Sequence, residues 1–301
     1  MRSIARHAAG FRALFVALAT LGMATAGAAD RYWPPIVDPP TGQHTPGRFV
    51  WGELVTADVA TAAEFYGKVF GWTFETYGDE DDRNTYTLAL ADGLPIGGMV
   101  YDSRAMKSGK PSARWVGLIS VTDVPAAAAA AQSSGGTVVR TPVMLGERGE
   151  TAIIRDPEGA LFGVVRSKNG DPLDYAGDLN EWYWVDLWTS DVEKAAAFYR
   201  SVVGYETVPI ADDGPRSGLR LLSGGFARGG IMQKRNPKAS TTWLPYLRVA
   251  DIKAATAAAK NAGGTVLMEP VVMQSARVAI VADPTGAPVG IVEVAAREAQ
   301  P

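Results

Sequence analysis

The sequence predicts an α+β protein made of two tandem copies of one domain, and each copy is predicted to hold two βαβββ units. The first observation is an internal repeat, because residues 58–71 recur as residues 191–204 with the same Asp-Val, Ala-Ala, Phe-Tyr, Val and Gly positions. The second is that each copy divides into two halves with the same order of one strand, one helix and three strands. Repeats of this kind indicate that the chain holds two copies of one domain, each with its own core.

Positions that flank the repeat correspond as well. Trp51 and Glu53 in the first copy match Trp184 and Asp186 in the second, at the offset of 133 residues that separates the repeated blocks. The offset falls to 127 or 128 residues later in each copy, as small loop deletions would produce. The whole domain is therefore duplicated, and not the helix alone.

The first unit is predicted to begin with a strand and to continue with a helix that Asp58 caps, because an Asp side chain accepts hydrogen bonds from the free N–H groups of a first turn. The apolar stripe of that helix includes Ala62, Phe65 and Tyr66. Gly71 follows and is expected to end the helix. The four strands of this unit are expected at residues 51–56, 72–76, 85–90 and 96–101.

In the second unit, Asp123 and Pro125 are expected to open an alanine-rich helix, because Asp favours the N-cap and Pro the first turn. Gly135 and Gly136 end the helix with the conformational freedom that a C-cap requires. The second copy is expected to repeat these elements in the same order. The strands of this second unit are expected at residues 115–121, 137–142, 151–155 and 161–166.

The sequence Asp-Pro-x-Gly stands between the last two strands of each copy, at residues 156–159 and 283–286. Asp at the first position, Pro at the second and Gly at the fourth are the preferences of a type I turn. We therefore interpret both segments as turns and not as active-site motifs.

The first 29 residues have the composition of a secretory signal peptide. Arg2, Arg6 and Arg12 precede an apolar run over residues 13–23, and small residues follow. The alternative is an uncleaved membrane anchor, for which the apolar run is short. Cleavage predicts a periplasmic or secreted protein that meets a membrane only through the signal peptide before cleavage.

The remaining organisation follows from composition. A proline-rich segment is interpreted as an extended linker or surface arm that contributes nothing to a core. Because both copies lie in one chain, we expect the two domains to pair within the molecule and a monomer to suffice. The predicted boundaries are residues 1–29 for the signal peptide, 30–48 for the linker, 49–166 for the first domain, 167–181 for a second linker, 182–294 for the second domain and 295–301 for a tail.

Composition excludes several functions. The formal net charge is −3, which becomes −6 once three arginines leave with the signal peptide, so no nucleic-acid partner is expected. The chain has no cysteine, which excludes disulfides and thiol catalysis. The mature chain would keep a single histidine, His44, which is expected to be free in the linker. A facial triad for iron needs two histidines, so extradiol dioxygenase chemistry is not expected.

Taken together, the paired βαβββ order, the Asp-capped helices with Phe-Tyr and a following Gly, the Gly-Gly after the second helix and the Asp-Pro-x-Gly turns resemble the vicinal oxygen chelate superfamily. That superfamily includes glyoxalase I, extradiol dioxygenases and bleomycin resistance proteins. The resemblance covers nearly all of residues 49–294. It implies two cupped mixed sheets, and in the enzymes each cup holds a divalent metal on His, Gln or Glu side chains from four strands.

Carried over position by position, the metal ligands that the resemblance implies are missing here. Divalent ions of this kind need carboxylate or imidazole donors. We therefore expect no metal and no other cofactor. The corresponding positions are Trp51, Val116 and Gly163, with a third-strand position near Thr87, in the first copy, and Trp184, Leu244 and Gly290, with a position near Arg220, in the second.

Residues two apart on a strand share a face, so Glu53 and Asp186 are predicted to point into the cups beside their neighbouring tryptophans. A carboxylate in an aromatic-lined cup is a candidate for a raised pKa and acid/base catalysis, or for binding a cationic ligand. Glu53 and Asp186 are thus the candidate catalytic residues. The candidate ligand-binding residues are Trp51, Trp184, Trp188, Trp115, Trp243, Tyr86 and Met99.

Structural interpretations of the same residues stay open. The carboxylates would then pair with an arginine, for which Arg114, Arg155 and Arg277 are candidates, and the tryptophans of the first strands would fill a vestigial metal site. For Trp115 and Trp243 packing is the favoured alternative.

Three functions are consistent with the sequence. The first is an exported protein that binds a small organic molecule in a metal-free cup. The second is a metal-independent lyase, isomerase or hydrolase that uses Glu53 and Asp186 as base and acid. The third is a structural role with both cups filled by the chain itself. A metal-dependent lyase of the glyoxalase type is the least favoured, because fold alone does not carry function.

Overall fold

The computed structural model describes residues 31–78, 85–107, 110–174, 177–210, 218–234, 236–273 and 276–294. The predicted signal peptide and the C-terminal tail lie outside the described residues. Within the described ranges, no helix is long and apolar enough to cross a membrane.

The first copy contains the two predicted βαβββ units, with element ends within a few residues of those expected. A one-turn 3₁₀ helix and a two-residue hairpin between the units were not predicted. The elements are β1 (Phe49–Thr56), α1 (Val59–Phe70), β2 (Thr73–Tyr77), β3 (Tyr86–Ala91), β4 (Leu94–Tyr101), η1 (Ser103–Ala105), β5 (Met106–Lys107), β6 (Lys110–Pro111), β7 (Arg114–Ser120), α2 (Val124–Ser133), β8 (Thr137–Leu145), β9 (Gly149–Arg155) and β10 (Leu161–Ser167).

The second copy repeats this order without the small insertion. Its elements are β11 (Trp182–Thr189), α3 (Val192–Val203), β12 (Glu206–Pro209), β13 (Gly218–Ser223), β14 (Phe226–Gln233), β15 (Thr242–Arg248), α4 (Ile252–Asn261), β16 (Thr265–Met273), β17 (Ala276–Ala282) and β18 (Pro288–Val294).

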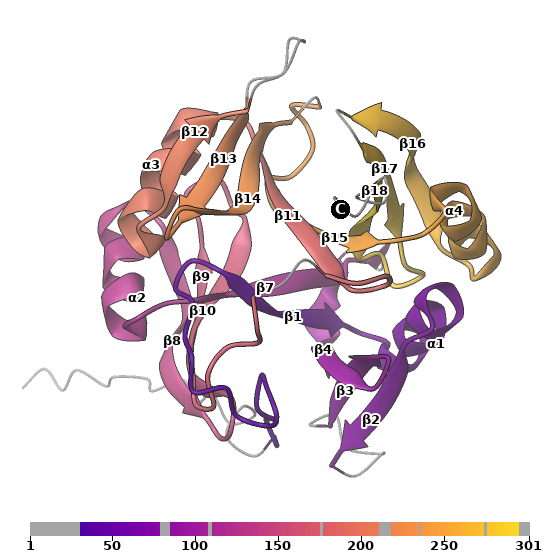
Figure 1. The fold of residues 1–301 in the computed structure, drawn as a ribbon, viewed down its shortest axis with the longest axis horizontal. Helices are drawn as coiled ribbons and strands as arrows, with labels where there is room; N and C mark the ends of the chain where they lie inside the picture. The colour runs from indigo at the N-terminus through magenta and orange to yellow at the C-terminus, as the bar shows by residue number, and fades with distance from the viewer. Residues whose placement is uncertain are drawn as a thin grey trace, which may run out of the picture.

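Each copy forms one mixed eight-stranded sheet. The strand order is β2-β3-β4-β1-β7-β10-β9-β8 in the first copy and β12-β13-β14-β11-β15-β18-β17-β16 in the second. The first strand of a copy pairs parallel to the fourth strand of its own unit and antiparallel to the first strand of the next, as β1 does with β4 and β7. Figure 1 shows the two sheets above one another, with the helices along their outer sides. The predicted α+β class and tandem cupped sheets are confirmed.

The helices begin and end at the residues that the sequence indicates. Asp58 accepts a hydrogen bond from the Thr61 N–H at 3.0 Å, and Asp191 accepts one from the Lys194 N–H at 3.1 Å. Gly71 adopts the left-handed conformation with φ of 72°, which completes the C-cap of α1.

The Asp-Pro-x-Gly segments are turns, as predicted. In the first of them the Gly159 N–H bonds to the Asp156 carbonyl at 3.0 Å, and the Asp156 side chain accepts from the Ala160 N–H at 2.8 Å. The same carboxylate also accepts a hydrogen bond from the Tyr199 hydroxyl of the second copy at 3.1 Å. The turn therefore helps to join the two domains.

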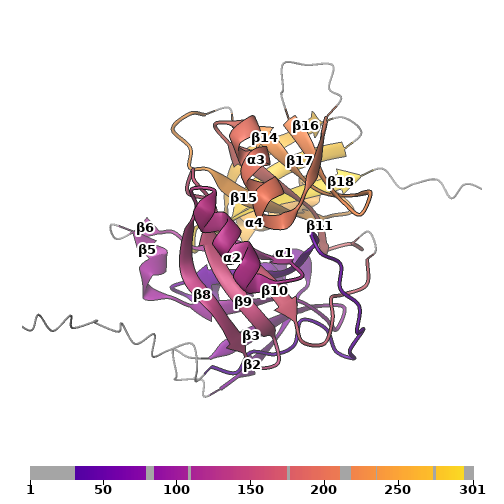
Figure 2. The same cartoon turned by 90° about the vertical axis from the view of Figure 1, so that its left-hand side faces the viewer.

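The two domains pair within the chain through their helical faces. Helix α1 packs against α4 and α2 packs against α3, as Figures 1 and 2 show from two directions. One core cluster joins Phe65 of α1 to Val281 of β17, and another joins Phe162 of β10 to Phe198 of α3. The apolar stripes of the repeated helices thus cover the partner domain as well as their own sheet.

Two tryptophan–tyrosine pairs mark this interface. Trp115 donates its indole N–H to the Tyr66 hydroxyl at 2.7 Å, and Trp243 donates to the Tyr199 hydroxyl at 2.8 Å. The face of each sheet that these residues occupy is the face directed toward the helices. The opposite face of each sheet is therefore the one that could hold a ligand.

Candidate functional site on two inner faces

We call the sheet faces directed away from the helices the inner faces. The first inner face is defined by Trp51, Glu53, Tyr86, Leu88, Leu118 and Val165, and the second by Trp184, Asp186, Trp188, Leu244, Tyr246 and Val292.

The same tryptophan–carboxylate pair stands on the first strand of both copies. The Trp51 indole N–H donates to Glu53 Oε1 at 2.8 Å, and the Trp184 indole N–H donates to Asp186 Oδ1 at 2.8 Å. Alternation along β1 and β11 directs each pair to one face. The structure therefore places these four residues as the sequence analysis expected.

Glycines on neighbouring strands make room for these side chains. A β-carbon at Gly230 would overlap the Asp186 carboxylate, and a β-carbon at Gly290 would overlap the ring of Tyr246. Gly98 does the same for the Tyr86 hydroxyl on the first inner face. Gly163 and Gly290, at positions where the superfamily's metal ligands were expected, thus admit a side chain from the next strand instead.

On the first inner face Glu53 is held by a buried arginine. Arg148 Nη1 donates to Glu53 Oε1 at 2.5 Å, and Arg148 Nη2 donates to the Tyr86 hydroxyl at 2.7 Å. The Tyr86 hydroxyl in turn donates to Glu53 Oε1 at 2.8 Å. The Arg148 side chain is 1% exposed and that of Glu53 is 9% exposed. The structural interpretation of Glu53 therefore holds, but the predicted partners Arg114, Arg155 and Arg277 are wrong.

The proline-rich arm closes this face, which corrects the expectation that it contributes nothing to a core. Trp33 and Ile36 of the arm are buried against Trp51, Tyr86 and Leu118. The Pro34 carbonyl accepts a hydrogen bond from Arg148 Nε at 2.9 Å. Composition alone does not reveal what a proline-rich segment packs against, so this contact could not be predicted from the sequence.

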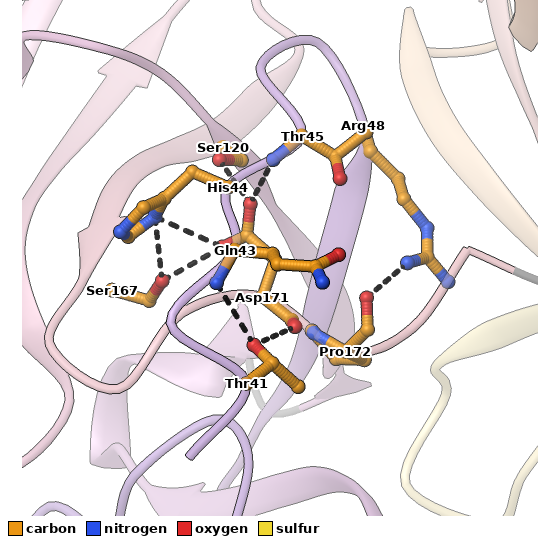
Figure 3. Close-up of polar contacts among 9 residues, drawn as sticks. All are labelled: Thr41, Gln43, His44, Thr45, Arg48, Ser120, Ser167, Asp171 and Pro172. Carbon is orange, nitrogen blue, oxygen red and sulfur yellow. Dashed lines mark hydrogen bonds and ion pairs between the residues drawn. The ribbon is translucent and has the colours of Figure 1, made fainter.

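A cluster centred on Asp171 fastens the far end of the arm (Figure 3). Asp171 Oδ2 accepts hydrogen bonds from the Thr45 N–H at 2.7 Å and from Ser120 Oγ at 2.6 Å. Thr41 Oγ1 donates to the Asp171 carbonyl at 2.7 Å. The linker after the first domain thus ties the arm to β7.

His44, Ser167 and Asp171 meet in this cluster but do not form a catalytic triad. Ser167 Oγ donates to Asp171 Oδ1 at 2.7 Å and lies 3.3 Å from His44 Nδ1, the same nitrogen that lies 3.8 Å from that carboxylate oxygen. In a triad the serine and the carboxylate contact opposite nitrogens of the imidazole. His44 therefore has a structural contact here, and the expectation of a free linker histidine is wrong.

The second inner face differs because no arm covers it in the described part of the chain. Trp184, Asp186 and Trp188 are all partly exposed, whereas Trp51 and Glu53 are buried. Trp188 takes the place of Val55 of the first copy, and its indole N–H lies 3.4 Å from the Tyr246 hydroxyl. Burial raises the pKa of Asp186 to about 6, and hydrogen bonds from Trp184 and Tyr246 oppose that rise.

No described lysine or arginine forms an ion pair with Asp186. Strand register assigns two arginines to this face. Arg220 pairs with Gly230, the partner of Asp186, and Arg248 pairs with Val292 at the end of β15, where it donates to the Gly177 carbonyl at 3.3 Å. Arg220 is exposed. Asp186 is therefore a carboxylate in aromatic surroundings without the tethered cation that Glu53 has.

Three predicted ligand-binding residues lie on the opposite face. Trp115 and Trp243 bond to the helix tyrosines of the domain interface, and Met99 is completely buried in the core beneath α1. The two tryptophans are therefore packed at the domain interface, which was the favoured alternative for them. Tyr86 does face the first inner face, and Trp188 faces the second.

Neither inner face presents the set of carboxylate and imidazole donors that a divalent metal needs. On β3 the inner-face residue is Leu88, one position after the expected Thr87, and the other corresponding positions hold tryptophan, valine, leucine and glycine. No group of three or more His, Cys, Asp or Glu side chains in the described ranges is placed to hold a metal ion.

Family models match both copies. A model of the Glyoxalase/Bleomycin resistance protein/Dioxygenase superfamily matches residues 47–164, and a model of a Glyoxalase-like domain matches residues 182–292. The chain belongs to this superfamily. The resemblance to the vicinal oxygen chelate superfamily that the motifs indicated is confirmed, and the protein is a tandem-domain member.

Two relatives align over nearly their whole length. The chain is 29% identical over 253 residues to "Putative glyoxylase CFP32" of Mycobacterium tuberculosis (strain CDC 1551 / Oshkosh), covering 83% of this chain and 95% of the relative. It is 30% identical over 278 residues to "Anthracycline biosynthesis protein DauV" of Streptomyces sp. (strain C5), covering 85% and 96%.

Among solved structures, the Mn(II)-bound glyoxalase from Novosphingobium aromaticivorans superimposes with a TM-score of 0.57 at 16% identity, covering 83% of this chain and 82% of that one. Likeness at this level shows the fold alone.

Three residues that shape the faces escaped the sequence analysis. Arg148 stands in a β-turn outside the repeated motifs, and Trp33 lies in the arm. Tyr246 corresponds to Leu118 in the first copy, so the two copies differ at this position and their comparison did not single it out. An arginine in a turn between strands and an aromatic residue in a proline-rich segment are weak signals of burial, because both residue types are also common at a protein surface.

Proposed function

We propose that the protein binds a small organic molecule on its second inner face and that the first inner face serves as scaffold. The observation that carries the proposal is the asymmetry between the copies. The arm and Arg148 fill the first inner face, whereas Trp184, Asp186 and Trp188 of the second remain partly exposed. Exposed aromatic area beside one polar group is the usual composition of a small-molecule site.

The relatives support a small-molecule ligand without naming it. One is described as an anthracycline biosynthesis protein and another as a glyoxylase, and both descriptions concern small organic compounds. The donor set argues against the metal chemistry of the superfamily, so the proposed site is metal-free. Two indoles supply apolar area, and Asp186 supplies charge.

The test is a ligand screen read at individual tryptophans. Protein comprising residues 30–301 would be titrated with small aromatic compounds while the indole N–H signals are followed by NMR, with assignments from Trp184→Phe and Trp188→Phe. The expected result is that ligands shift the Trp184 and Trp188 signals and leave Trp51 unchanged. Shifts confined to Trp51, or none at any tryptophan, would refute the proposal.

A second candidate function is favoured by the raised pKa of Asp186. A carboxyl group with a pKa of about 6 can exchange protons near neutral pH, as a general base or acid must. The face would then catalyse a metal-independent isomerisation, elimination or hydrolysis. Asp186→Asn separates the two functions, because a base would lose turnover while ligand contact at Trp184 persists.

We also propose that the protein is exported, on the pattern of residues 1–29. Fractionation of cells expressing the full chain would place the product outside the cytoplasm and shorten it at the N-terminus. A full-length product in the cytoplasmic fraction would contradict export without affecting the binding proposal.

A further inference from the structure

We infer that the ligand of the second inner face carries a cationic nitrogen group, a guanidinium, amidinium or ammonium, on an aromatic or apolar body. This inference rests on the proposed binding function and specifies its chemistry. The first inner face shows how a tryptophan–carboxylate pair on this strand holds a cation. The second presents the corresponding pair without one.

On the first inner face the cation belongs to the chain itself. The Arg148 guanidinium carbon lies 4.5 Å from the ring centroid of Trp51 and 5.4 Å from that of Tyr86. The guanidinium also donates to Glu53 Oε1 at 2.5 Å. A carboxylate at one edge and aromatic faces around it are the two elements that recognise cationic nitrogen groups.

The second inner face has the same elements in the same register. Glu53 pairs with Gly98 and Asp186 with Gly230, so the carboxylates occupy equivalent places in their sheets. Trp184 donates to Asp186 as Trp51 donates to Glu53. Trp188 adds a second indole from β11 itself, whereas the second indole beside Arg148 is Trp33 of the arm, whose ring centroid lies 5.8 Å from the guanidinium carbon.

The tethered cation has no structural equivalent in the described part of the second copy. Arg148 precedes β9 directly. Among the described residues, no Arg or Lys side chain comes within ion-pair distance of Asp186. A carboxylate surrounded by apolar groups is costly when it stays unpaired. A cation brought by the ligand would supply what Arg148 supplies to Glu53.

Strand register places two cationic side chains on this face, and both would oppose a cationic ligand. Arg248 stands four residues beyond Leu244, the partner of Asp186, and donates to the Gly177 carbonyl. Arg220 is the other. It is exposed and lies two strands from Asp186, so it would attract an anionic ligand and weaken a cationic one. The other titratable group at Asp186 is Tyr246, which bonds to it. On β16 to β18 the inner face is apolar, with Met268, Ile280 and Val292.

Three probes of one shape and different charge test the inference: benzamidinium, benzamide and benzoate. Each would be titrated by calorimetry and NMR into protein comprising residues 30–301. We expect benzamidinium to bind at least about tenfold more tightly than benzamide and to shift the Trp184 and Trp188 signals. Asp186→Asn should remove this preference and leave the benzamide affinity unchanged.

The matched control is Glu293→Gln. Glu293 is a carboxylate on the same sheet that bonds to Arg277 at 3.1 Å, away from the inner face. This substitution also removes one negative charge, so a general charge effect would appear in both variants. We expect the preference for benzamidinium to survive it, and Arg220→Gln to keep or strengthen the preference.

The pH profile gives an independent readout. Benzamidinium stays charged across the range, whereas Asp186 takes up a proton below its pKa of about 6. Cation affinity should therefore fall about tenfold from pH 7.5 to pH 5, and benzamide affinity should stay constant.

The outcomes separate this inference from the proposed function. Equal binding of benzamide and benzamidinium at Trp184 and Trp188 would overturn the cationic ligand and keep the binding site. Preference for benzoate that Arg220→Gln abolishes would do the same in favour of an anion. No response of either indole to any probe at about 10 mM would overturn both proposals.

Discussion

The first and second inner faces carry the same tryptophan–carboxylate pair on corresponding strands but differ in what surrounds it. Around Glu53 the chain supplies a buried arginine and two apolar side chains of the arm. Around Asp186 the described chain supplies indoles and a tyrosine hydroxyl, and the face remains partly exposed. The domain interface, in contrast, is alike in both copies, with one Trp–Tyr pair from each.

In the first copy the chain itself fills the inner face, whereas in the second copy the corresponding face stays partly exposed. A face that is filled by its own chain adds to the stability of the molecule. A partly open face with a charged group has a cost in stability, which is common where a ligand binds.

The largest effect is expected from Arg148→Met. This substitution leaves the Glu53 carboxylate buried without its cation, and loss of one partner of a buried pair lowers the free energy of unfolding by about 3–5 kcal/mol. Urea denaturation measures the loss. The double variant Glu53→Gln, Arg148→Met should recover at least half of it, because no unpaired charge remains. An equal loss in the double variant would mean that packing of the guanidinium, and not charge, dominates.

The next effect is expected from Trp33→Ala in the arm. Trp33 is 7% exposed and packs against Tyr86, so its removal leaves a cavity and lowers the free energy of unfolding by about 3 kcal/mol. The neighbouring Tyr32 is 48% exposed and provides the control, since Tyr32→Ala should change stability by less than about 1 kcal/mol. A similar small change for both variants would show that the arm does not fill the first inner face in solution.

Asp186→Asn should act with the opposite sign. Burial raises the folded pKa of Asp186 to about 6, above its ordinary value of 3.8, so the folded state favours the protonated form. Ionisation of Asp186 therefore lowers the free energy of unfolding as pH rises through about 6. The uncharged amide of Asp186→Asn should raise that free energy by about 2 kcal/mol at pH 8, a value that allows for the partial exposure of the side chain.

The measurement is urea unfolding of both proteins at several pH values. The gain of Asp186→Asn should be full at pH 8 and should disappear near pH 4, where the native carboxyl is protonated too. A destabilised variant at pH 8 would indicate that Asp186 is a structural carboxylate like Glu53, and the contrast between the faces would fail.

The smallest effect is expected from Ser167→Ala in the Asp171 cluster. Asp171 keeps its bonds from Thr45 and Ser120, so loss of the single Ser167 hydrogen bond should cost about 1 kcal/mol in urea unfolding. Ser133→Ala on the exposed surface of α2 is the control. Any activity found for the protein should survive Ser167→Ala, and its loss would reinstate a catalytic role for that serine.

Much of the fold could be predicted because its signals are local. Asp58 and Gly71 mark the ends of α1, and the same residue types mark α3, since capping depends on a few neighbouring residues. Strand alternation likewise predicted the face on which Glu53 and Asp186 lie. The side to which Met99 points depends on strand register, and the structure places it in the core and not on the predicted face. For Trp115 packing was already the favoured interpretation.

The duplication, the order of the βαβββ units, the superfamily and the lack of metal donors at the corresponding positions could all be predicted from the sequence, because each depends on residue identity and spacing. Which inner face is closed became evident only from the three-dimensional packing. Trp33, Glu53 and Arg148 are far apart in the chain, and their contact depends on how the arm returns to the sheet and where one turn ends. Such long-range packing leaves no periodic trace in a sequence, whereas a cap or a strand does.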